Sequence, residues 1–238
     1  MADLSYSSVS AWRICSASFG AAGNWQPWGN VEATAAGNPR PLHGAVASHL
    51  DADLHVPVLT LSDEAAGTTK VWHTIRFSAN GSWQPFGEVT ATAAGNPSAQ
   101  SRYGTLGCAQ VGTDLHLVVT GADFNGTGTI FHTIRFTADG SWQPFGNVNQ
   151  QIQGAAFSEV ACAEVGGDLH VVATDPGGTL WHTIRFSADG SWQPVGNASA
   201  AAGDPNAWFA IVACANAGGD LHVVGATTTR PRRRLSRD

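Results

Sequence analysis

The segment Thr179-Leu-Trp-His-Thr-Ile-Arg-Phe-Ser-Ala-Asp-Gly-Ser-Trp-Gln-Pro194 recurs along the chain with few changes. Close copies occur at 72–85 and 131–144, and a more divergent copy occurs at 12–27. A second motif, Asp-Leu-His, precedes each close copy and begins at Asp53, Asp114 and Asp168; a fourth example begins at Asp220. Self-similarity at a regular spacing is typical of a repeat architecture, so we expect a fold built from copies of one unit.

Each unit contains four short β-type segments separated by turns. In the third unit these segments run over 157–165, 169–174, 179–187 and 191–195. Glycine-containing turns separate them, and such turns between β-type segments favour hairpins because the tight turn types need positive φ angles. Three consecutive hairpins predict a four-stranded antiparallel sheet.

Both faces of the long third segment carry large side chains. Leu180, His182 and Ile184 lie on one face, while Trp181 and Arg185 lie on the other. An antiparallel sheet with one face in water would carry small or polar residues on that face. A sheet that is stacked between two similar sheets buries both faces. The predicted fold class is therefore all-β, a β-propeller of four-stranded antiparallel blades.

The repeats predict one propeller domain over 1–229, with three complete blades at about 43–89, 103–148 and 157–198. The segment 5–31 aligns only with third and fourth strands, and the segment 208–228 aligns only with first and second strands. Together they predict a fourth, composite blade that is closed by strands from both termini, so that the ring has no free edge. A homo-oligomer in which the terminal strands pair between chains is the alternative. The Ala- and Gly-rich connections between blades are expected to be surface loops.

Composition and charge narrow the classes of function. Only 13% of the residues are charged and the net charge is −6, although the segment 230–238 holds five arginines and is expected to be a disordered basic tail. An acidic body argues against binding of nucleic acid. The sequence has no long apolar run, which predicts no membrane span, and no secretory signal at its start. We expect a cytoplasmic location or export by a non-classical route.

The cysteines and histidines do not show the spacing of a metal site. Cys108, Cys162 and Cys214 occupy the same place in successive units and are expected to be buried free thiols. The nine histidines lack the spacing of a four-ligand zinc site and are expected to satisfy buried polar groups. We therefore expect no metal and no other cofactor.

A set of aromatic, His and Arg side chains recurs in every unit and forms the candidate ligand-binding set. The third strand contributes an aromatic residue, a His and an Arg, and the fourth strand contributes a Trp before Gln-Pro. The members are Trp72, His73, Arg76 and Trp83; Phe131, His132, Arg135 and Trp142; and Trp181, His182, Arg185 and Trp192. An indole can stack on the apolar face of a sugar, and Arg and His can bind its hydroxyls. The alternative is structural: Trp as an anchor between blades, Arg stacked on a ring or capping a carbonyl, and His bound to buried backbone or to the Asp of a neighbouring blade.

The repetition of these polar residues argues against catalysis. An active site needs one unique constellation of groups, and the recurring carboxylates here are turn residues such as Asp139 and Asp189. No nucleophile, phosphate-binding or paired-carboxylate motif is present. Repeated similar sites suit multivalent binding, in which linked weak sites gain avidity. The sequence thus predicts a protein that is not an enzyme and has no catalytic residues.

The repeat resembles that of bacterial β-propeller lectins of the Photorhabdus lectin type and, more loosely, of tectonin-like propellers. The resemblance rests on Asp-Leu-His-Val-Val at 168–172, Leu-Trp-His at 180–182 and Gly-Ser-Trp-Gln-Pro at 190–194, and it covers about 5–228. It implies binding of mono- or oligosaccharides, such as fucose-like or methylated sugars, between adjacent blades. The leading hypothesis is a multivalent, lectin-like module; the alternatives are a protein–protein interaction scaffold that uses the basic tail as an electrostatic arm, or an inert product of gene duplication.

Overall fold

The computed structural model describes residues 15–18, 23–37, 42–63, 68–93, 102–122, 128–153 and 156–227. The predicted basic tail at 230–238 lies outside these residues, as do Trp12 and Arg13 of the divergent repeat. The described part consists of β-strands and single-turn helices.

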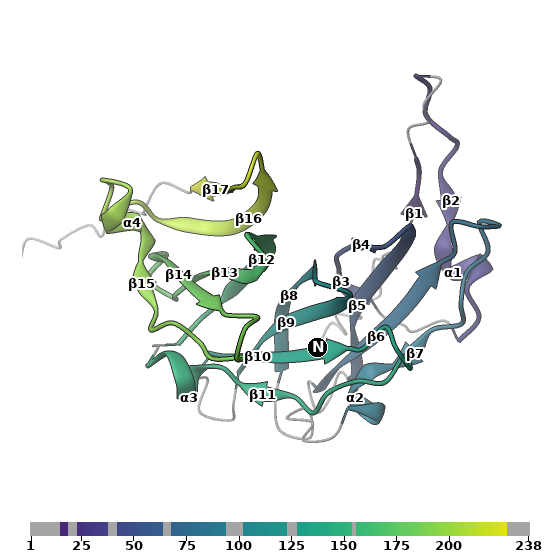
Figure 1. Cartoon of the computed structure of the whole chain (residues 1–238), viewed down its shortest axis with the longest axis horizontal. Helices are drawn as coiled ribbons and strands as arrows, with labels where there is room; N and C mark the ends of the chain where they lie inside the picture. Colours follow the sequence, from purple (N-terminus) through teal and green to yellow (C-terminus); the bar gives the residue numbers. More distant parts are fainter. Residues whose placement is uncertain are drawn as a thin grey trace, which may run out of the picture.

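Three complete sheets share one antiparallel order, and we call them blades one, two and three (Figure 1). Blade one contains β3 (Leu42–Ala45), β4 (Ser48–Leu50), β5 (Asp53–Asp63), β6 (Thr68–Arg76) and β7 (Gly87–Glu88). Blade two contains β8 (Arg102–Val111), β9 (Asp114–Ala122), β10 (Gly128–Arg135) and β11 (Gly146–Asn147). Blade three contains β12 (Glu159–Val165), β13 (Asp168–Thr174), β14 (Leu180–Arg185) and β15 (Gly196–Asn197). In blade one the innermost strand is interrupted, so β3 and β4 pair with different parts of β5.

Two further sheets have two strands each, and we call them half-blades. The N-terminal half-blade (15–18 and 23–37) contains β1 (Cys15–Ser16) and β2 (Gly29–Asn30), and the C-terminal half-blade (208–227) contains β16 (Phe209–Ala217) and β17 (Asp220–Thr227). Figure 1 shows them at opposite ends of the row of blades, and the described residues include no pairing between them. The composite blade therefore remains a prediction.

The outer strand of each blade is shorter and lies later in the chain than the sequence predicts. In blade three it was expected at 191–195, but the ladder forms at Gly196–Asn197, and Trp192 makes one isolated bridge with Arg185. Pro194 explains the difference, because it has no N–H to donate to a ladder. The same bridge joins Trp83 to Arg76 and Trp142 to Arg135.

The connections after the outer strands are not simple surface loops, which corrects the sequence-based expectation. Each begins with one helical turn: α1 (Val31–Thr34), α2 (Val89–Thr92), α3 (Asn149–Ile152) and α4 (Ala198–Ala201). Asn30 caps α1 by accepting the Ala33 N–H at 3.2 Å, and Asn197 caps α4 in the same way at 2.8 Å. No helix among the described residues has the length and apolar character that a membrane span requires.

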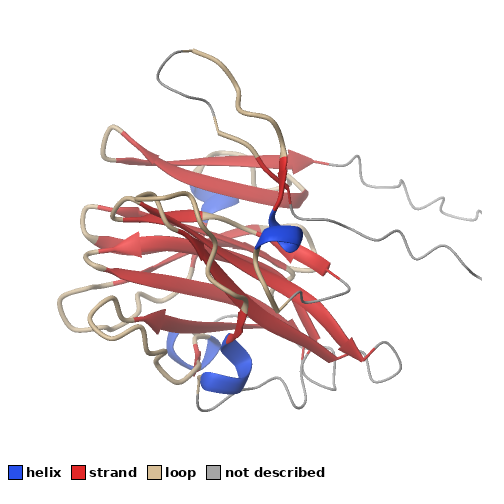
Figure 2. Cartoon of the chain, turned by 90° about the vertical axis from the view of Figure 1, so that its right-hand side faces the viewer, coloured by secondary structure: helices blue, strands red, loops and turns tan. Residues whose placement is uncertain are grey.

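The core is divided among the junctions between successive sheets rather than gathered in one centre, and the strands of neighbouring sheets lie in layers (Figure 2). One apolar cluster joins the N-terminal half-blade to blade one, a second joins blades one and two, a third joins blades two and three, and a fourth joins blade three to the C-terminal half-blade. Because each complete sheet is covered on both faces, the predicted all-β propeller class is confirmed.

The cysteines of blades two and three lie within these clusters. Cys162 is buried and Cys108 is half-buried, and both thiols are free. Burial raises the pKa of the Cys108 thiol to about 12, so this group stays protonated and unreactive at neutral pH. These residues act in packing.

Candidate functional site

Each complete blade contains a pair of hydrogen-bonded histidines on its second and third strands. The Nδ1 of the Asp-Leu-His histidine faces the Nε2 of the third-strand histidine in the pairs His55–His73 (3.0 Å), His116–His132 (3.1 Å) and His170–His182 (3.1 Å). One nitrogen donates the hydrogen bond and the other accepts it, so the two rings cannot carry a positive charge at the same time. The histidines thus satisfy one another, rather than the backbone or a carboxylate.

Burial keeps these histidines neutral. The pKa of His55 is lowered to about 4, chiefly by burial and further by the Arg135 guanidinium of the next blade. The pKa of His116 is lowered to about 4 by burial and by Arg185. Burial also holds the pKa values of His73 and His132 well below the ordinary range. Neutral imidazoles can therefore both donate and accept at the junctions between blades.

The third-strand histidine of one blade touches the outer Trp of the following blade. The ring centroids of His73 and Trp142 are 5.4 Å apart at 80°, and those of His132 and Trp192 are 5.5 Å apart at 79°. This edge-to-face arrangement is favourable for aromatic rings. The junctions therefore bring together residues that the sequence places in different units.

A cavity of about 340 Å³ lies at the junction of blades one and two, and we call it the second groove. Blade one contributes one wall and blade two the other. The lining residues are His73, Gln84, Gly87, Glu88 and Thr92 from blade one, and Arg135, Gly140, Ser141 and Trp142 from blade two. Trp142 is held by its neighbour, because the Gln143 carbonyl accepts a 2.6 Å hydrogen bond from the Thr133 hydroxyl.

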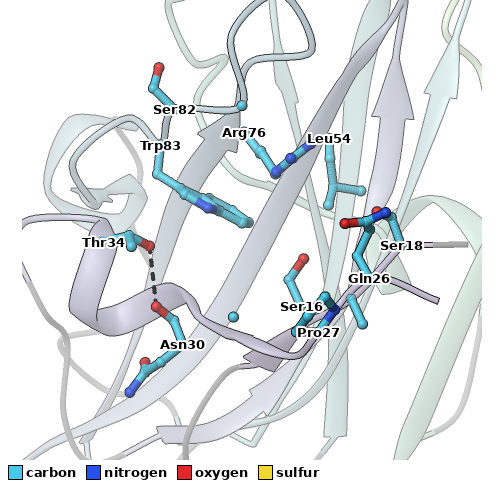
Figure 3. Close-up of a pocket in the computed structure, with 13 residues that line it drawn as sticks. Ser16, Ser18, Gln26, Pro27, Asn30, Thr34, Leu54, Arg76, Ser82 and Trp83 are labelled. Carbon is cyan, nitrogen blue, oxygen red and sulfur yellow. Dashed lines mark hydrogen bonds between the residues drawn. The ribbon is translucent and has the colours of Figure 1, made fainter. Parts of the chain in front are cut away.

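An equivalent cavity of about 510 Å³, the first groove, lies between the N-terminal half-blade and blade one (Figure 3). Arg76 and Trp83 come from blade one, while Ser16, Asn30 and Thr34 face them from the half-blade. The strand register identifies the matches: Ser16 lies opposite Gly29 as His73 lies opposite Gly87, and Asn30 takes the place of Glu88. The two grooves are therefore copies of one frame with different side chains on one wall.

The shared wall depends on an arginine that lies over a turn glycine. Gly140 has φ +74°, and a Cβ placed on it would lie 3.0 Å from the Arg135 Nη2; at Gly81 the corresponding distance to Arg76 is 3.1 Å. The turn thus needs glycine both for its backbone angle and for the space that the guanidinium occupies. Burial lowers the pKa of Arg135 from its usual range, although Asp139 opposes this effect.

Glu88 and Lys70 distinguish the second groove from its copies. Lys70 is the only lysine in the chain, and its Nζ lies 2.9 Å from the Glu88 Oε2. The other carboxylate oxygen, Oε1, accepts a hydrogen bond from the Thr90 hydroxyl at 3.0 Å. In the other repeats the place of Glu88 is taken by Asn30, Asn147 and Asn197. Our sequence analysis missed Glu88, although one acidic residue among three asparagines could have revealed it.

The third-strand aromatic residues lie elsewhere. Trp72 packs in the cluster with the N-terminal half-blade and donates its indole N–H to Thr60 at 3.0 Å. Trp181 packs between blades two and three and donates to Asp175 at 3.0 Å. Phe131 packs between blades one and two. Neither described groove is lined by these three residues.

The predicted residues of blade three make the same kinds of contact as their equivalents in blades one and two. Arg185 bridges Trp192, which packs between blades two and three against His132. His182 pairs with His170 in blade three. Among the described residues, no group of three His, Cys, Asp or Glu side chains could hold a metal ion.

Comparison with known proteins supports the fold. No family model and no curated protein matches the sequence. Among solved structures, Trypanosoma rangeli sialidase is similar with a TM-score of 0.54 and 14% identity, over 84% of this chain and 36% of that one. Hadza microbial sialidase Hz136 has a TM-score of 0.53 and 11% identity, over 72% and 42% of the two chains. Penicillium chrysogenum α-L-arabinanase complexed with arabinobiose has a TM-score of 0.51 and 14% identity, over 86% and 59%.

These comparisons correct the functional prediction. The similar structures are glycoside hydrolases with propeller folds, which overturns the prediction of a non-enzymatic, multivalent lectin and, with it, of a protein that is not an enzyme. They support the propeller fold, but do not support membership of the Photorhabdus lectin family. The physical reason for the error is that the repeated residues build the frame of the junctions, while one junction carries groups that its copies lack. The chain spans less than two thirds of the length of each of these hydrolases.

Proposed function

We propose that the chain is a carbohydrate-processing β-propeller domain and that the second groove holds the sugar. The observation that carries this proposal is the position of Glu88, which lines the same cavity as Trp142, Arg135 and His73. Glu88 is the only carboxylate among the residues that line either described groove. Processing of a glycosidic bond relies on carboxyl groups for proton transfer and for activation of water.

The groups of the second groove have distinct roles in this proposal. The half-buried indole of Trp142 provides an apolar surface for one face of a pyranose or furanose ring. Arg135 donates hydrogen bonds to ring hydroxyls, and neutral His73 lies beside Trp142 on the opposite wall. Lys70 and Thr90 hold one oxygen of Glu88 each, which fixes the position of the carboxylate. In the proposed step Glu88 accepts a proton from water while the water oxygen bonds to the anomeric carbon, the glycosidic C–O bond breaks, and the departing oxygen takes up a proton from solvent. Glu88 is the one carboxylate that we assign to this chemistry.

The similar structures support the substrate class. The Trypanosoma rangeli sialidase is known in complex with sialic acid, and the Penicillium chrysogenum arabinanase is complexed with arabinobiose. Fold alone does not determine activity, because one fold can host many functions. The substrate class is therefore argued from the groove, whose combination of an indole, a guanidinium and a carboxylate suits a polyhydroxylated ring.

The test is release of sugar from a panel of glycans that contain sialic acid or arabinose. We expect turnover by the unmodified chain and a loss of about 100-fold in Glu88→Gln, which is the scale of a general acid–base group. Glu164→Gln, on β12 of blade three, is the matched control and should retain full turnover. Absence of turnover on every glycan, or full turnover by Glu88→Gln, would contradict the proposal.

A further inference from the structure

At each complete junction, an apolar residue from the outer part of one blade packs on the helical turn of the preceding sheet. Phe86 packs with Ala35, Phe145 packs with Ala93, and Val195 lies against Ile152. Backbone hydrogen bonds hold two of these contacts, from the Phe86 N–H to the Ala36 carbonyl at 2.8 Å and from the Val195 N–H to the Ile152 carbonyl at 3.1 Å. This contact therefore defines how one blade follows another.

The two ends of the chain each present one half of this contact to solvent. Trp28 follows Trp25-Gln-Pro in the sequence and so corresponds to Phe86, yet it is 73% exposed whereas Phe86 is 6% exposed. At the other end, Ala202 follows α4 as Ala35 follows α1, and it is exposed whereas Ala35 is buried. In the described part, the N-terminal half-blade thus exposes an apolar side chain that no helical turn covers. The C-terminal end exposes a helical turn on which such a side chain could pack.

The C-terminal half-blade shows the same lack of cover. Val224 is 72% exposed, while the corresponding residues Val118 and Val172 are at most 1% exposed because the next sheet covers them. In complete blades the second strand pairs with a third, but in the described part β17 pairs only with β16. An unpaired strand edge beside an exposed apolar face can pair with another strand and bury that face.

We propose that the N-terminal half-blade of a second copy of the chain docks on this end, with β1 beside β17 and Trp28 on Ala202. The complete blades identify the occupant of the open edge of β17, because in them the second strand pairs with a third strand and the third with a fourth. The face of β17 that carries Val224 would then be covered by blade one of the same second copy, as blade three covers Val118 of blade two. The missing parts are the third and fourth strands, and the N-terminal half-blade supplies them: Cys15 pairs with Asn30 as Trp181 pairs with Asn197. The assembly is head-to-tail, and two copies can close it into one ring.

Two observations favour a second copy over the same chain. The N-terminal half-blade is attached to its own blade one through Val31, Ala35 and Phe86. Figure 1 shows β2 and β17 at opposite ends of the row of blades.

Docking would also complete a groove that neither chain completes alone. In the second groove Trp142 of blade two lies edge-on to His73 of blade one. In the assembly, Trp25 of the second copy takes the corresponding place beside His182 of blade three, since Trp25 matches Trp142 in the repeat. The resulting groove contains residues from two chains.

The experiment is measurement of molar mass by light scattering on the complete chain and on variants of each end. We expect twice the chain mass for the unmodified protein and the single-chain mass for both Trp28→Asp and Val224→Asp, since each places a charge in the apolar contact. Both side chains are largely exposed, so these variants should fold, which circular dichroism would verify. Gln150→Asp, exposed on α3, is the control with the same added charge and should remain dimeric.

Mixing the two variants distinguishes the head-to-tail contact from other dimers. The intact C-terminal end of Trp28→Asp can meet the intact N-terminal end of Val224→Asp, so the mixture should recover a dimer that neither variant forms alone. A monomeric unmodified protein overturns the proposal and favours closure within one chain. A dimer that survives both substitutions, or a mixture that stays monomeric, also overturns it.

Discussion

The first and second grooves are built on the same frame but differ in chemistry. Both have an arginine over a turn glycine and a tryptophan that is bridged to that arginine. On the opposite wall the first groove has Ser16 and Asn30, where the second has His73 and Glu88. The recurring positions thus form the shape of both cavities, and Glu88, whose place is taken by Asn in the other repeats, gives the second groove its carboxylate.

The largest effect is expected when the equivalent tryptophan of either groove, Trp83 or Trp142, is removed. Trp142→Ala and Trp83→Ala should each lower the free energy of unfolding by about 2–3 kcal/mol, because each indole is half-buried in the cluster between its blade and the preceding sheet. Turnover should be lost only in Trp142→Ala. Denaturant titration and sugar release below the unfolding transition would measure the two effects. If Trp83→Ala loses turnover and Trp142→Ala retains it, the assignment of the sugar to the second groove is wrong.

A second prediction concerns the loss of stability in acid. We expect this loss at the second groove, where His73 is paired with His55, because the first groove has Ser16 in the place of His73. Since the folded pKa of His55 is lowered to about 4 from 6.5, the unfolded chain binds more protons between these values. The stability is therefore complete above pH 6.5 and is lost as the pH falls towards 4. His55 alone should remove on the order of 2 kcal/mol between pH 7 and pH 5.

The variant His73→Ser, which copies Ser16 of the first groove, tests this prediction. It should cost about 1–2 kcal/mol at pH 7, because His55 loses its buried partner, and it should reduce the additional loss at pH 5. Unfolding in urea at both pH values measures the difference, with exposed His49→Ser as the control. An equal acid loss in His73→Ser and the unmodified chain would show that the pair is not responsible.

A smaller effect is expected from the ion pair. Lys70→Gln should lower the free energy of unfolding by about 0.5 kcal/mol, because Lys70 is 39% exposed and the pair is screened by water. This cost in the free energy of unfolding should be smaller in about 1 M salt, because salt shortens the distance over which the two charges interact. A cost of several kcal/mol that does not depend on salt would show a different role for Lys70.

Asn30→Asp sharpens the same comparison from the other side. It places a carboxylate in the first groove, where Asp can still cap α1 as Asn does, so stability should change by only a few tenths of a kcal/mol. In a Glu88→Gln background this variant should not restore turnover, since the first groove has no His73 or Lys70. Recovery of turnover would show that a carboxylate in the shared frame is sufficient.

Part of the candidate site could be predicted from the sequence. Trp142, Arg135 and His73 were identified because they recur, and the structure brings these three together in one cavity. Their neighbours Trp72, Phe131 and Trp181 recur as faithfully but lie in apolar clusters. Phe131 shares a face of β10 with Arg135, but it lies four residues earlier, where apolar side chains fill the junction. Recurrence therefore identified the members of the frame without distinguishing groove from core. Glu88 was missed for the opposite reason, since it does not recur.

The sequence by itself determined the all-β class, the four-segment unit and the hairpins, because turn glycines and residue alternation act over a few neighbours in the chain. It also predicted that the two ends are halves of one blade, and the described residues include no strand pairing that tests this prediction. Only the tertiary structure decided which faces meet: His73 and Trp142 are far apart in the sequence and touch because blade two packs on blade one. The exposure of Trp28 and Val224 was likewise decided by packing, since burial depends on what a neighbouring sheet covers and not on the residue type.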